Sequence, residues 1–285
     1  MISKNFLFLI ILLFPLFFFV IYYDKKIVLI DDKPIYKKEL LLFKKVQENC
    51  YKNRSINEEE ALAMLISNKL ELAVLKKKYK LEPEKSLLIQ KAKWIDKNTK
   101  DPKTLKCIKK IYFPFYKRYY LEDIVKPTLV NPKLHFSFSQ DREIHKEEIG
   151  QIEDIIKKVK NKPELLKNFK EYTKATTSKN REEKIEIGGY SFAVPEDPFV
   201  FNVLAKMKKG EIFQNIVEDD YSFKIVRLID EDKEYYYWEG VVIMKKNFYD
   251  WFRNYVIENV KIKILDEELK EKFKKKYPDI WWPIE

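Results

Sequence analysis

Side chains suited to acid–base or nucleophilic chemistry are scarce in this chain. The sequence has two histidines, His135 and His145, and two cysteines, Cys50 and Cys107. Histidine is the side chain that changes charge near neutral pH. His135 stands in the alternating stretch LHFSFS, whereas His145 stands in the polar stretch DREIHKEE, which predicts a solvated side chain without a site role. Acid–base chemistry at neutral pH would therefore depend on very few groups.

Other motifs that carry chemistry are missing from the sequence. It contains no glycine-rich phosphate-binding loop, no Cys/His spacing typical of a metal site and no Ser-His-Asp set. Carboxylates are plentiful but scattered among lysines, so no two of them stand out as an acid and a base. We expect neither a metal nor a cofactor.

The composition predicts a globular body with a mixed-charge surface. Of the 285 residues, 46% are hydrophobic and 35% are charged, and the net charge is +11. Lysine and glutamate are interleaved along the whole chain, and no basic block stands alone. We therefore expect a solvated surface and no nucleic-acid partner.

The N-terminal segment differs from the rest. Phe6 to Tyr23, FLFLIILLFPLFFFVIYY, carries no charge and is long enough for a membrane-spanning helix. A cleaved signal peptide is the alternative, but the run ends without the small residues that signal peptidase needs. We expect residues 1–26 to form a single-pass anchor in the cytoplasmic membrane. By analogy with signal anchors, most of the chain would then face the periplasm or the cell exterior.

Export of the chain would decide whether its two cysteines can be oxidised. In an oxidising compartment Cys50 and Cys107 could form a disulfide. Two separate thiols, free or buried, are the equally open alternative.

Residues 27–128 predict a mainly helical unit. The stretch IVLIDDKPIYKKELLLF indicates a strand, a turn and a helix. Asn57, with Glu60 three residues later, is typical of a helix N-terminus. Further helices are expected at about 83–98 and 103–125, and Pro127 and Pro132 mark the expected boundary.

Residues 133–240 predict an α+β domain. KLHFSFS and YSFKIVRLIDE alternate as strands, and EIGQIEDIIKKVK and PELLKNFKEYTK are spaced as helices. A helix from about Phe199 to Met207 is expected to end at Gly210, and the pair Gly188-Gly189 predicts a tight turn. Residues 241–285 are expected to form a helix and strand extension.

These elements resemble the parvulin-type foldases of the SurA, PrsA and PpiD kind. IDDKPIYKKELLLF and ALAMLISNKLELAVLKKKYKL are similar to the opening and the long helix of their N-terminal chaperone domain. GGYSF, MKKGEI and YSFKIVRL follow the order of the parvulin elements G-G-D-L-G, G-E-I and G-Y-H-I-I. VKIKILDEEL resembles the segment that returns to the chaperone domain. The resemblance thus implies an α+β fold with a SurA-like helical domain, a parvulin-like domain and a returning C-terminal helix.

The resemblance also implies a prolyl-isomerase site with part of its machinery missing. It places His135 at the first histidine of the family and Ser222 at the second, and Ser222 cannot titrate near neutral pH. The thiol or carboxylate position falls near Ala175. Phe199 takes the place of the pocket phenylalanine. Val194 and Tyr221 are the other candidates for substrate binding, and for His135 and Phe199 a purely structural role is equally open.

The resemblance therefore predicts a membrane-anchored chaperone that binds unfolded or newly exported polypeptides, with weak or lost isomerase activity. Two alternatives stay open. One is a competent isomerase with an altered polar network. The other is a structural or assembly subunit that packs Trp281 and Trp282 on a partner, although packing within the chain is favoured for these tryptophans.

Overall fold

The chain folds into two compact units. The computed structural model describes residues 25–285 except 52–54, 114, 180–181, 188–189 and 196–197. Unit 1 comprises the described residues through His135 together with Tyr249–Glu285, and unit 2 comprises Phe136–Phe248. The chain therefore leaves unit 1 and later returns to it.

Unit 1 contains a three-stranded antiparallel sheet that joins the two ends of the described chain. Its strands are β1 (Lys26–Ile30), β2 (Lys33–Tyr36) and β9 (Ile262–Ile264), in the order β2-β1-β9. A two-residue turn joins β1 to β2, and Asp31 adopts φ 48° there, which a short polar side chain tolerates. Val28 pairs with Ile264, so residues far apart in sequence close the sheet.

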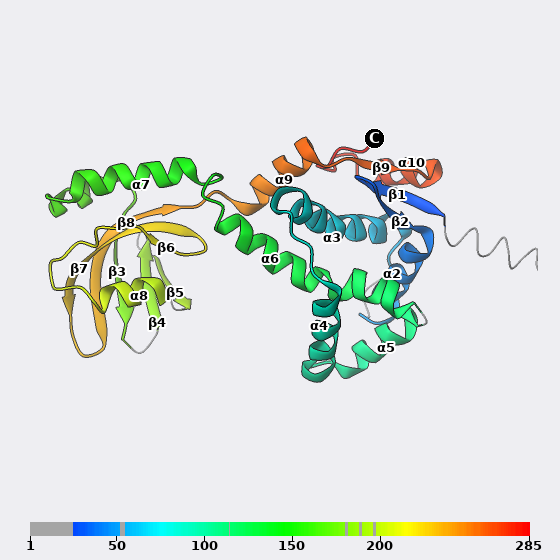
Figure 1. Cartoon of the computed structure of the whole chain (residues 1–285), viewed down its shortest axis with the longest axis horizontal. Coiled ribbons are helices and arrows are strands. Elements are labelled where there is room, and N and C mark those ends of the chain that lie inside the picture. Colours follow the sequence, from blue (N-terminus) through cyan, green and yellow to red (C-terminus); the bar gives the residue numbers. More distant parts are fainter. Residues whose placement is uncertain (1–24, 52–54, 114, 180–181, 188–189, 196–197) are drawn as a thin grey trace, which may run out of the picture. The chain divides into compact units, whose positions relative to one another are not determined.

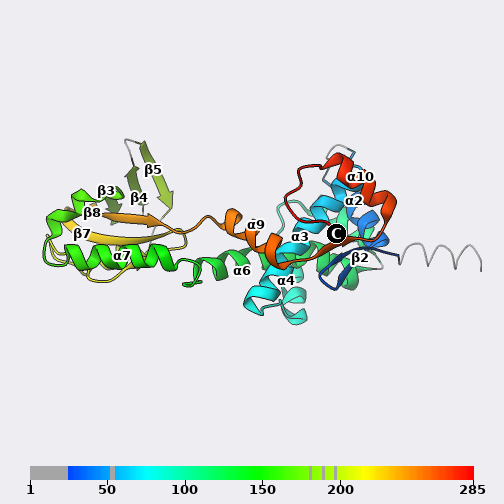
Figure 2. The same ribbon diagram turned by 90° about the horizontal axis from the view of Figure 1, so that it is seen from above.

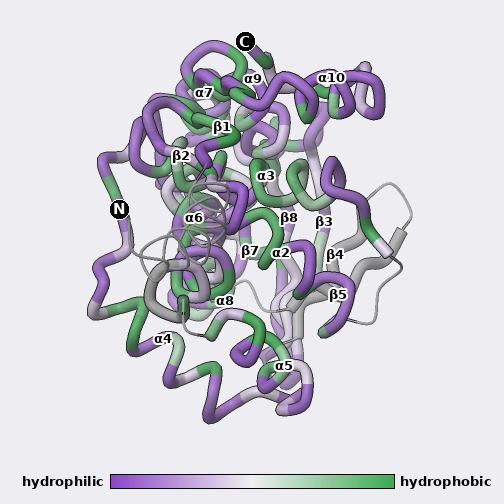
Figure 3. The backbone as a smooth tube through the Cα atoms, turned by 90° about the vertical axis from the view of Figure 1, so that its right-hand side faces the viewer, coloured by the Kyte–Doolittle hydropathy of each residue, from purple (hydrophilic) through white to green (hydrophobic). Residues whose placement is uncertain are grey.

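The rest of unit 1 is mainly helical. Its helices are α2 (Lys37–Asn49), α3 (Glu58–Tyr79), α4 (Lys85–Asn98), α5 (Pro102–Tyr112), η1 (Tyr116–Val125), the first part of α6 (Pro127–Ser139), most of α9 (Phe248–Asn259) and α10 (Glu267–Lys276). The predicted start of α3 is confirmed, because the Asn57 side chain accepts a hydrogen bond from the Glu60 N–H at 2.9 Å. Figure 3 shows α3 as largely hydrophobic and α10 as largely hydrophilic. This contrast fits the central place of α3, which buries seven side chains, whereas α10 buries two.

Unit 2 is a six-stranded antiparallel sheet with a helix on each face (Figure 1). The strands are β3 (Tyr172–Ser178), β4 (Glu182–Ile187), β5 (Tyr190–Pro195), β6 (Val217–Glu218), β7 (Ser222–Glu231) and β8 (Tyr235–Met244), in the order β5-β4-β3-β8-β7-β6. Phe223 and Ile225 of β7 pack with α7 (Lys146–Val159), and Val226 and Leu228 pack with α8 (Pro198–Leu204). The predicted alternation of β7 is therefore correct. Figure 2 shows the β4–β5 hairpin at one edge of this sheet.

Three predicted elements were wrong in type or extent. KLHFSFS is part of the helix α6, where Leu134 and Phe138 are buried four residues apart and Phe136 is 54% exposed. PELLKNFKEYTK forms only the short 3₁₀ helix η2 (Pro163–Asn168) before β3 begins. The single helix expected at 103–125 is divided into α5 and the π-helix η1. Leucine and phenylalanine at alternate positions also satisfy a four-residue spacing, which explains the first error.

The predicted fold class and localisation both included a membrane-spanning helix, and both are corrected. Within residues 25–285, as far as the structure describes them, no helix combines the length and apolar character needed to cross a bilayer. The predicted span falls almost wholly on residues 1–24, which lie outside the described residues. The fold class is accordingly a mixed α+β chain with two antiparallel sheets.

Gly240 marks a close approach of β7 and β8. A Cβ atom there would lie 1.9 Å from the carbonyl oxygen of Ile225 on the neighbouring strand. Gly240→Ala is therefore expected to lower the free energy of unfolding of unit 2 by about 2–3 kcal/mol, measured by urea denaturation. Gly150→Ala is the matched control: no atom lies within 4 Å of its Cβ in α7. Gly150→Ala should raise the free energy of unfolding of unit 2 by about 0.5–1 kcal/mol. Equal effects of the two substitutions would contradict the steric reason.

Candidate functional site

One face of α3 forms the floor of a groove within unit 1. Its groove-lining residues recur every three or four positions, as the helical repeat requires: Leu65, Asn68, Lys69, Leu72, Ala73, Lys76, Lys77 and Lys80. They line three adjoining pockets, which together we call the α3 groove. Along the two larger pockets, from Lys69 to Lys80, the helix rises roughly 16 Å, at about 1.5 Å per residue. The groove is thus long enough for several residues of an extended chain.

Two walls enclose the α3 groove. The β1–β2 hairpin forms one wall with Ile30 to Tyr36, and the other wall contains Glu82, residues of η1 and the start of α6. The pocket near the end of α3 has a volume of about 770 Å³, and the next has about 340 Å³. The two share Ile30, Ala73 and three charged residues, so they are parts of one depression. Volumes of this size are typical of ligand sites.

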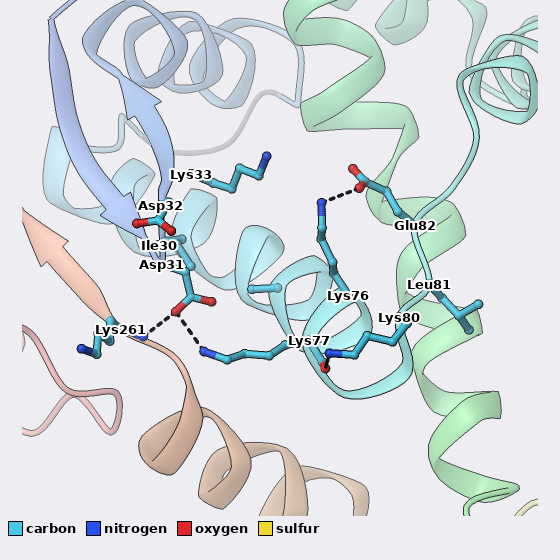
Figure 4. A pocket seen from close by; sticks show the side chains of 11 residues that line it. Ile30, Asp31, Asp32, Lys33, Lys76, Lys77, Lys80, Leu81, Glu82 and Lys261 are labelled. Carbon is cyan, nitrogen blue, oxygen red and sulfur yellow. Dashed lines mark hydrogen bonds and ion pairs between the residues drawn. The ribbon is translucent and has the colours of Figure 1, made fainter.

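Ion pairs hold several charged side chains of the α3 groove. Glu82 lies 2.9 Å from Lys76 and 3.1 Å from Lys126, and hydrogen bonding to Lys76 leads the effects that lower the pKa of Glu82. Asp31 lies 3.3 Å from Lys77 and accepts the backbone N–H of Lys261 (Figure 4). These contacts fix the hairpin and α3 on either side of the groove.

Other charges at the α3 groove are not neutralised. Within the described part of the chain, no ion pair is formed by Lys33, Lys80, Lys261 or Asp32, and all four residues are exposed. Lys80 donates to the carbonyl of Lys77 at 2.9 Å, at the negative end of the α3 dipole, and has no carboxylate partner among the described residues. Figure 4 shows Lys33 extending from the hairpin into the pocket, beside Lys76 of α3. Three lysines without a carboxylate partner and one aspartate without a cationic partner in the described chain therefore border the same pocket.

A buried charge cluster closes the inner end of the groove. The Lys69 ammonium lies 2.5 Å from Glu39 and 3.3 Å from Asp123, whose side chains are 4% and 0% exposed. Burial opposes the charge of Lys69, but the two carboxylates outweigh it and raise its pKa. Burial also raises the pKa of Asp123, against the opposing effect of Lys69. The cluster thus connects α2, α3 and η1 beneath the groove.

The predicted catalytic serine lies in unit 2 with its hydroxyl already engaged. Ser222 is the first residue of β7 and is 3% exposed. Its hydroxyl donates to the Asp219 carboxylate at 3.0 Å, and its N–H donates to the same group at 2.6 Å. Lys224 pairs with Asp219 at 2.6 Å. Ser222 therefore stabilises the turn before β7.

His135 does not belong to the same unit as the other predicted site residues. It lies on α6 in unit 1, where its ring packs edge to face on Tyr249 at 6.2 Å, and burial lowers its pKa. Phe199 opens α8 in unit 2 and is 55% exposed, and Tyr221 is 75% exposed. The structure therefore does not gather His135, Ser222 and Phe199 within one compact unit.

The remaining predicted residues have separate places. Val194 is on strand β5, and Gly188 and Gly189 lie outside the described residues. Gly210 adopts φ 84°, as expected for a turn glycine, and its N–H donates to Leu228 at 2.7 Å. In unit 1 the Trp281 ring packs on Phe252 and Trp282. The contacts of Gly210 and Trp281 therefore stabilise a turn and a packed aromatic group within the chain.

His145, expected to be solvated, is fully buried in unit 2. Its Nε2–H donates to the Phe138 carbonyl at 3.1 Å, and Nδ1 accepts the Lys246 N–H at 3.3 Å. The ring also packs edge to face on Phe138 and Phe223. In the neutral ring both nitrogens therefore form hydrogen bonds, one as a donor and one as an acceptor. The polar neighbours in sequence gave no sign of this, because the burying residues come from distant segments.

We expect the stability of unit 2 to decrease on acidification through His145. Burial lowers its pKa and outweighs the opposing hydrogen bond to the Phe138 carbonyl; the charge of Lys245 lowers the pKa further, against lesser effects of Glu148 and Asp141. The unfolded state then binds a proton more readily, so stability falls once the pH drops below the unfolded value of about 6.5. Hydrogen exchange of β7 and β8 amides between pH 7.5 and about pH 5 would measure the change. The same decrease in His145→Gln would contradict this origin.

The two cysteines are joined in unit 1. Cys50, at the end of α2, and Cys107, on α5, form a disulfide with a Cα–Cα distance of 5.6 Å. The bond lies beside a core cluster that includes Val46, Ile108 and Tyr112. It connects α2, the helix that follows the groove hairpin, to α5.

Among the residues whose placement is described, no group of three or more His, Cys, Asp and Glu side chains could hold a metal ion. No family model matches the chain, and no curated protein and no solved structure is significantly similar to it.

Proposed function

We propose that this protein is a chaperone that holds unfolded polypeptide segments in an extended conformation in the α3 groove. One observation carries the proposal: two overlapping pockets, of about 340 and 770 Å³, share α3 as their floor from Lys69 to Lys80, a rise of roughly 16 Å. An extended chain rises about 3.3 Å per residue, so about five residues would fit along this floor. A site of this length suits a chain segment better than a compact small molecule.

The chemistry of the groove supports low sequence specificity. Apolar side chains such as Leu72 on the floor and Leu81 at the rim lie among charged ones in the groove. Such a lining can cover apolar side chains of a client while its backbone and polar groups stay hydrated. The resemblance to SurA-like chaperones points in the same direction.

The proposal includes weak or absent prolyl isomerase activity. In parvulins the second histidine contributes to the polar part of the site, and the residue here is Ser222, whose hydroxyl is bonded to Asp219. The exposed ring of Phe199 could still contact a proline. Binding without appreciable turnover is the expected consequence.

Suppression of aggregation by the full chain tests the holding function. Ala73 lies on the groove floor, so Ala73→Phe should fill the depression and abolish suppression of an unfolded client's aggregation. Ala205→Phe, at an exposed position of unit 2, is the matched control and should keep wild-type activity. If the wild-type chain neither binds nor protects a range of unfolded clients, the proposal is wrong.

A prolyl-peptide isomerisation assay separates holding from catalysis. We expect the full chain to leave the uncatalysed rate nearly unchanged. A clear acceleration that falls in Phe199→Ala would favour a working isomerase instead.

A further inference from the structure

We infer that the α3 groove selects extended segments rich in aspartate and glutamate. The inference rests on the proposed function and adds the substrate class to it. It starts from the uncompensated charges: Lys33, Lys80 and Lys261 have no carboxylate partner in the described part of the chain, and Asp32 has no cationic one. These residues surround the pocket of about 770 Å³.

The three lysines come from three separate elements. Lys33 begins β2, Lys80 is the C-terminal cap of α3, and Lys261 precedes β9. In Figure 4 the Lys33 side chain extends into the pocket, the Lys80 ammonium bends back to the Lys77 carbonyl, and the Lys261 side chain extends away from α3. Lysine carries its charge on a long flexible stem, so the three ammonium groups can follow carboxylates at varying positions along a bound segment.

The edge of β2 cannot bind a peptide by extending the sheet. Ile30 pairs with Lys33 across a two-residue turn, so Pro34 and Tyr36 are the residues whose backbone faces away from β1. Pro34 has no N–H, and the Tyr36 N–H donates to Glu39 at 3.1 Å. With both outward donors of this edge unavailable, the side chains of the groove must determine which segments bind.

Charge then favours acidic segments. The carboxylates that could compete are already occupied, since Glu82 is paired with Lys76 and Lys126 and Asp31 with Lys77. A ligand carboxylate would meet ammonium groups that have no carboxylate partner, whereas a ligand lysine would meet Asp32 as the one carboxylate at this pocket without a cationic partner in the described part of the chain. Opposite charges across an interface improve selectivity and association rate, and salt weakens both effects.

Peptide binding to the full chain tests the inference. The probes are seven-residue peptides with blocked ends: one alternates leucine with aspartate, the other leucine with asparagine. We expect the acidic peptide to bind about tenfold more tightly at low salt, and the preference to shrink at about 0.5 M salt. The triple variant Lys33→Glu, Lys80→Glu and Lys261→Glu should lose the preference.

Two further variants show whether a lost preference comes from the groove charges and not from misfolding. Lys97→Glu, Lys100→Glu and Lys106→Glu change the net charge equally at exposed sites of unit 1 outside the groove, and should keep the preference. Asp32→Asn removes the one uncompensated anion and should tighten binding of the acidic peptide about twofold.

The outcomes separate this inference from the proposed function. Equal binding of both peptides would overturn the acidic selectivity and leave the holding function standing. No binding of either peptide, together with no suppression of aggregation, would overturn both. Tighter binding of a single-stranded oligonucleotide of seven nucleotides than of the acidic peptide would also overturn the inference.

Discussion

The free energy of unfolding of unit 1 is expected to fall by about 4 kcal/mol when Lys69 is replaced by methionine. The substitution removes the ammonium group that lies between Glu39 and Asp123, and both carboxylates are buried. Asp123 Oδ2 lacks a hydrogen-bond partner among the described residues, so the two neighbouring carboxyl groups would be left without the cation between them. Urea denaturation followed by tryptophan fluorescence measures the loss, because four of the five tryptophans belong to unit 1.

Two further variants test the cause of this loss. Lys272→Met breaks an exposed ion pair with Glu268 on α10 and should change stability by less than about 0.5 kcal/mol. Lys69→Met combined with Asp123→Asn should recover part of the loss, since one of the two buried charges is gone. A double variant as unstable as Lys69→Met plus Asp123→Asn added separately would argue against coupling within the cluster.

Removal of the disulfide is expected to destabilise unit 1 to a similar degree. Cys50 and Cys107 are 57 residues apart in sequence, and closing a loop of this length in the unfolded chain is worth about 4 kcal/mol in the chain-entropy model. Replacing both cysteines by alanine should therefore lower the midpoint of urea denaturation of unit 1. Hydrogen exchange of β7 and β8 should be unchanged, because these strands belong to unit 2.

The wild-type chain in reductant is the control for the disulfide. It keeps both sulfur atoms in the core, so equal stability of the reduced chain and the double alanine variant would assign the loss to the covalent bond. A reduced chain as stable as the oxidised one would contradict the prediction.

The predictions from sequence succeeded where a signal is confined to neighbouring residues. Asn57 caps α3, and alternating residues of β7 contact different helices. Each of these features depends on the spacing of a few residues within one element. Where one pattern satisfies two spacings, as in Leu134, Phe136 and Phe138, the local signal does not choose between strand and helix.

The candidate site depended on contacts that no local pattern contains. The stripe along α3 reads in sequence as an ordinary amphipathic face, and nothing in it indicates that the β1–β2 hairpin and Glu82 stand beside it. The resemblance directed attention to His135, Ser222 and Phe199, but a buried hydroxyl bonded to Asp219 can be recognised only in the folded chain. The burial of His145 likewise depends on Phe138 and Phe223, which come from other elements.

The sequence by itself determined the composition of the surface, the helix starts and the alternation of β7, because these follow from residue type and spacing. The tertiary structure alone decided which charges are neutralised. Asp31 reaches Lys77 and the N–H of Lys261, 46 and 230 residues away, while Lys33 beside it in the hairpin finds no carboxylate in the described part of the chain. The pairing of β1 with β2 and β9 brings these segments together. The charged side chains that remain without an oppositely charged partner there define the proposed site.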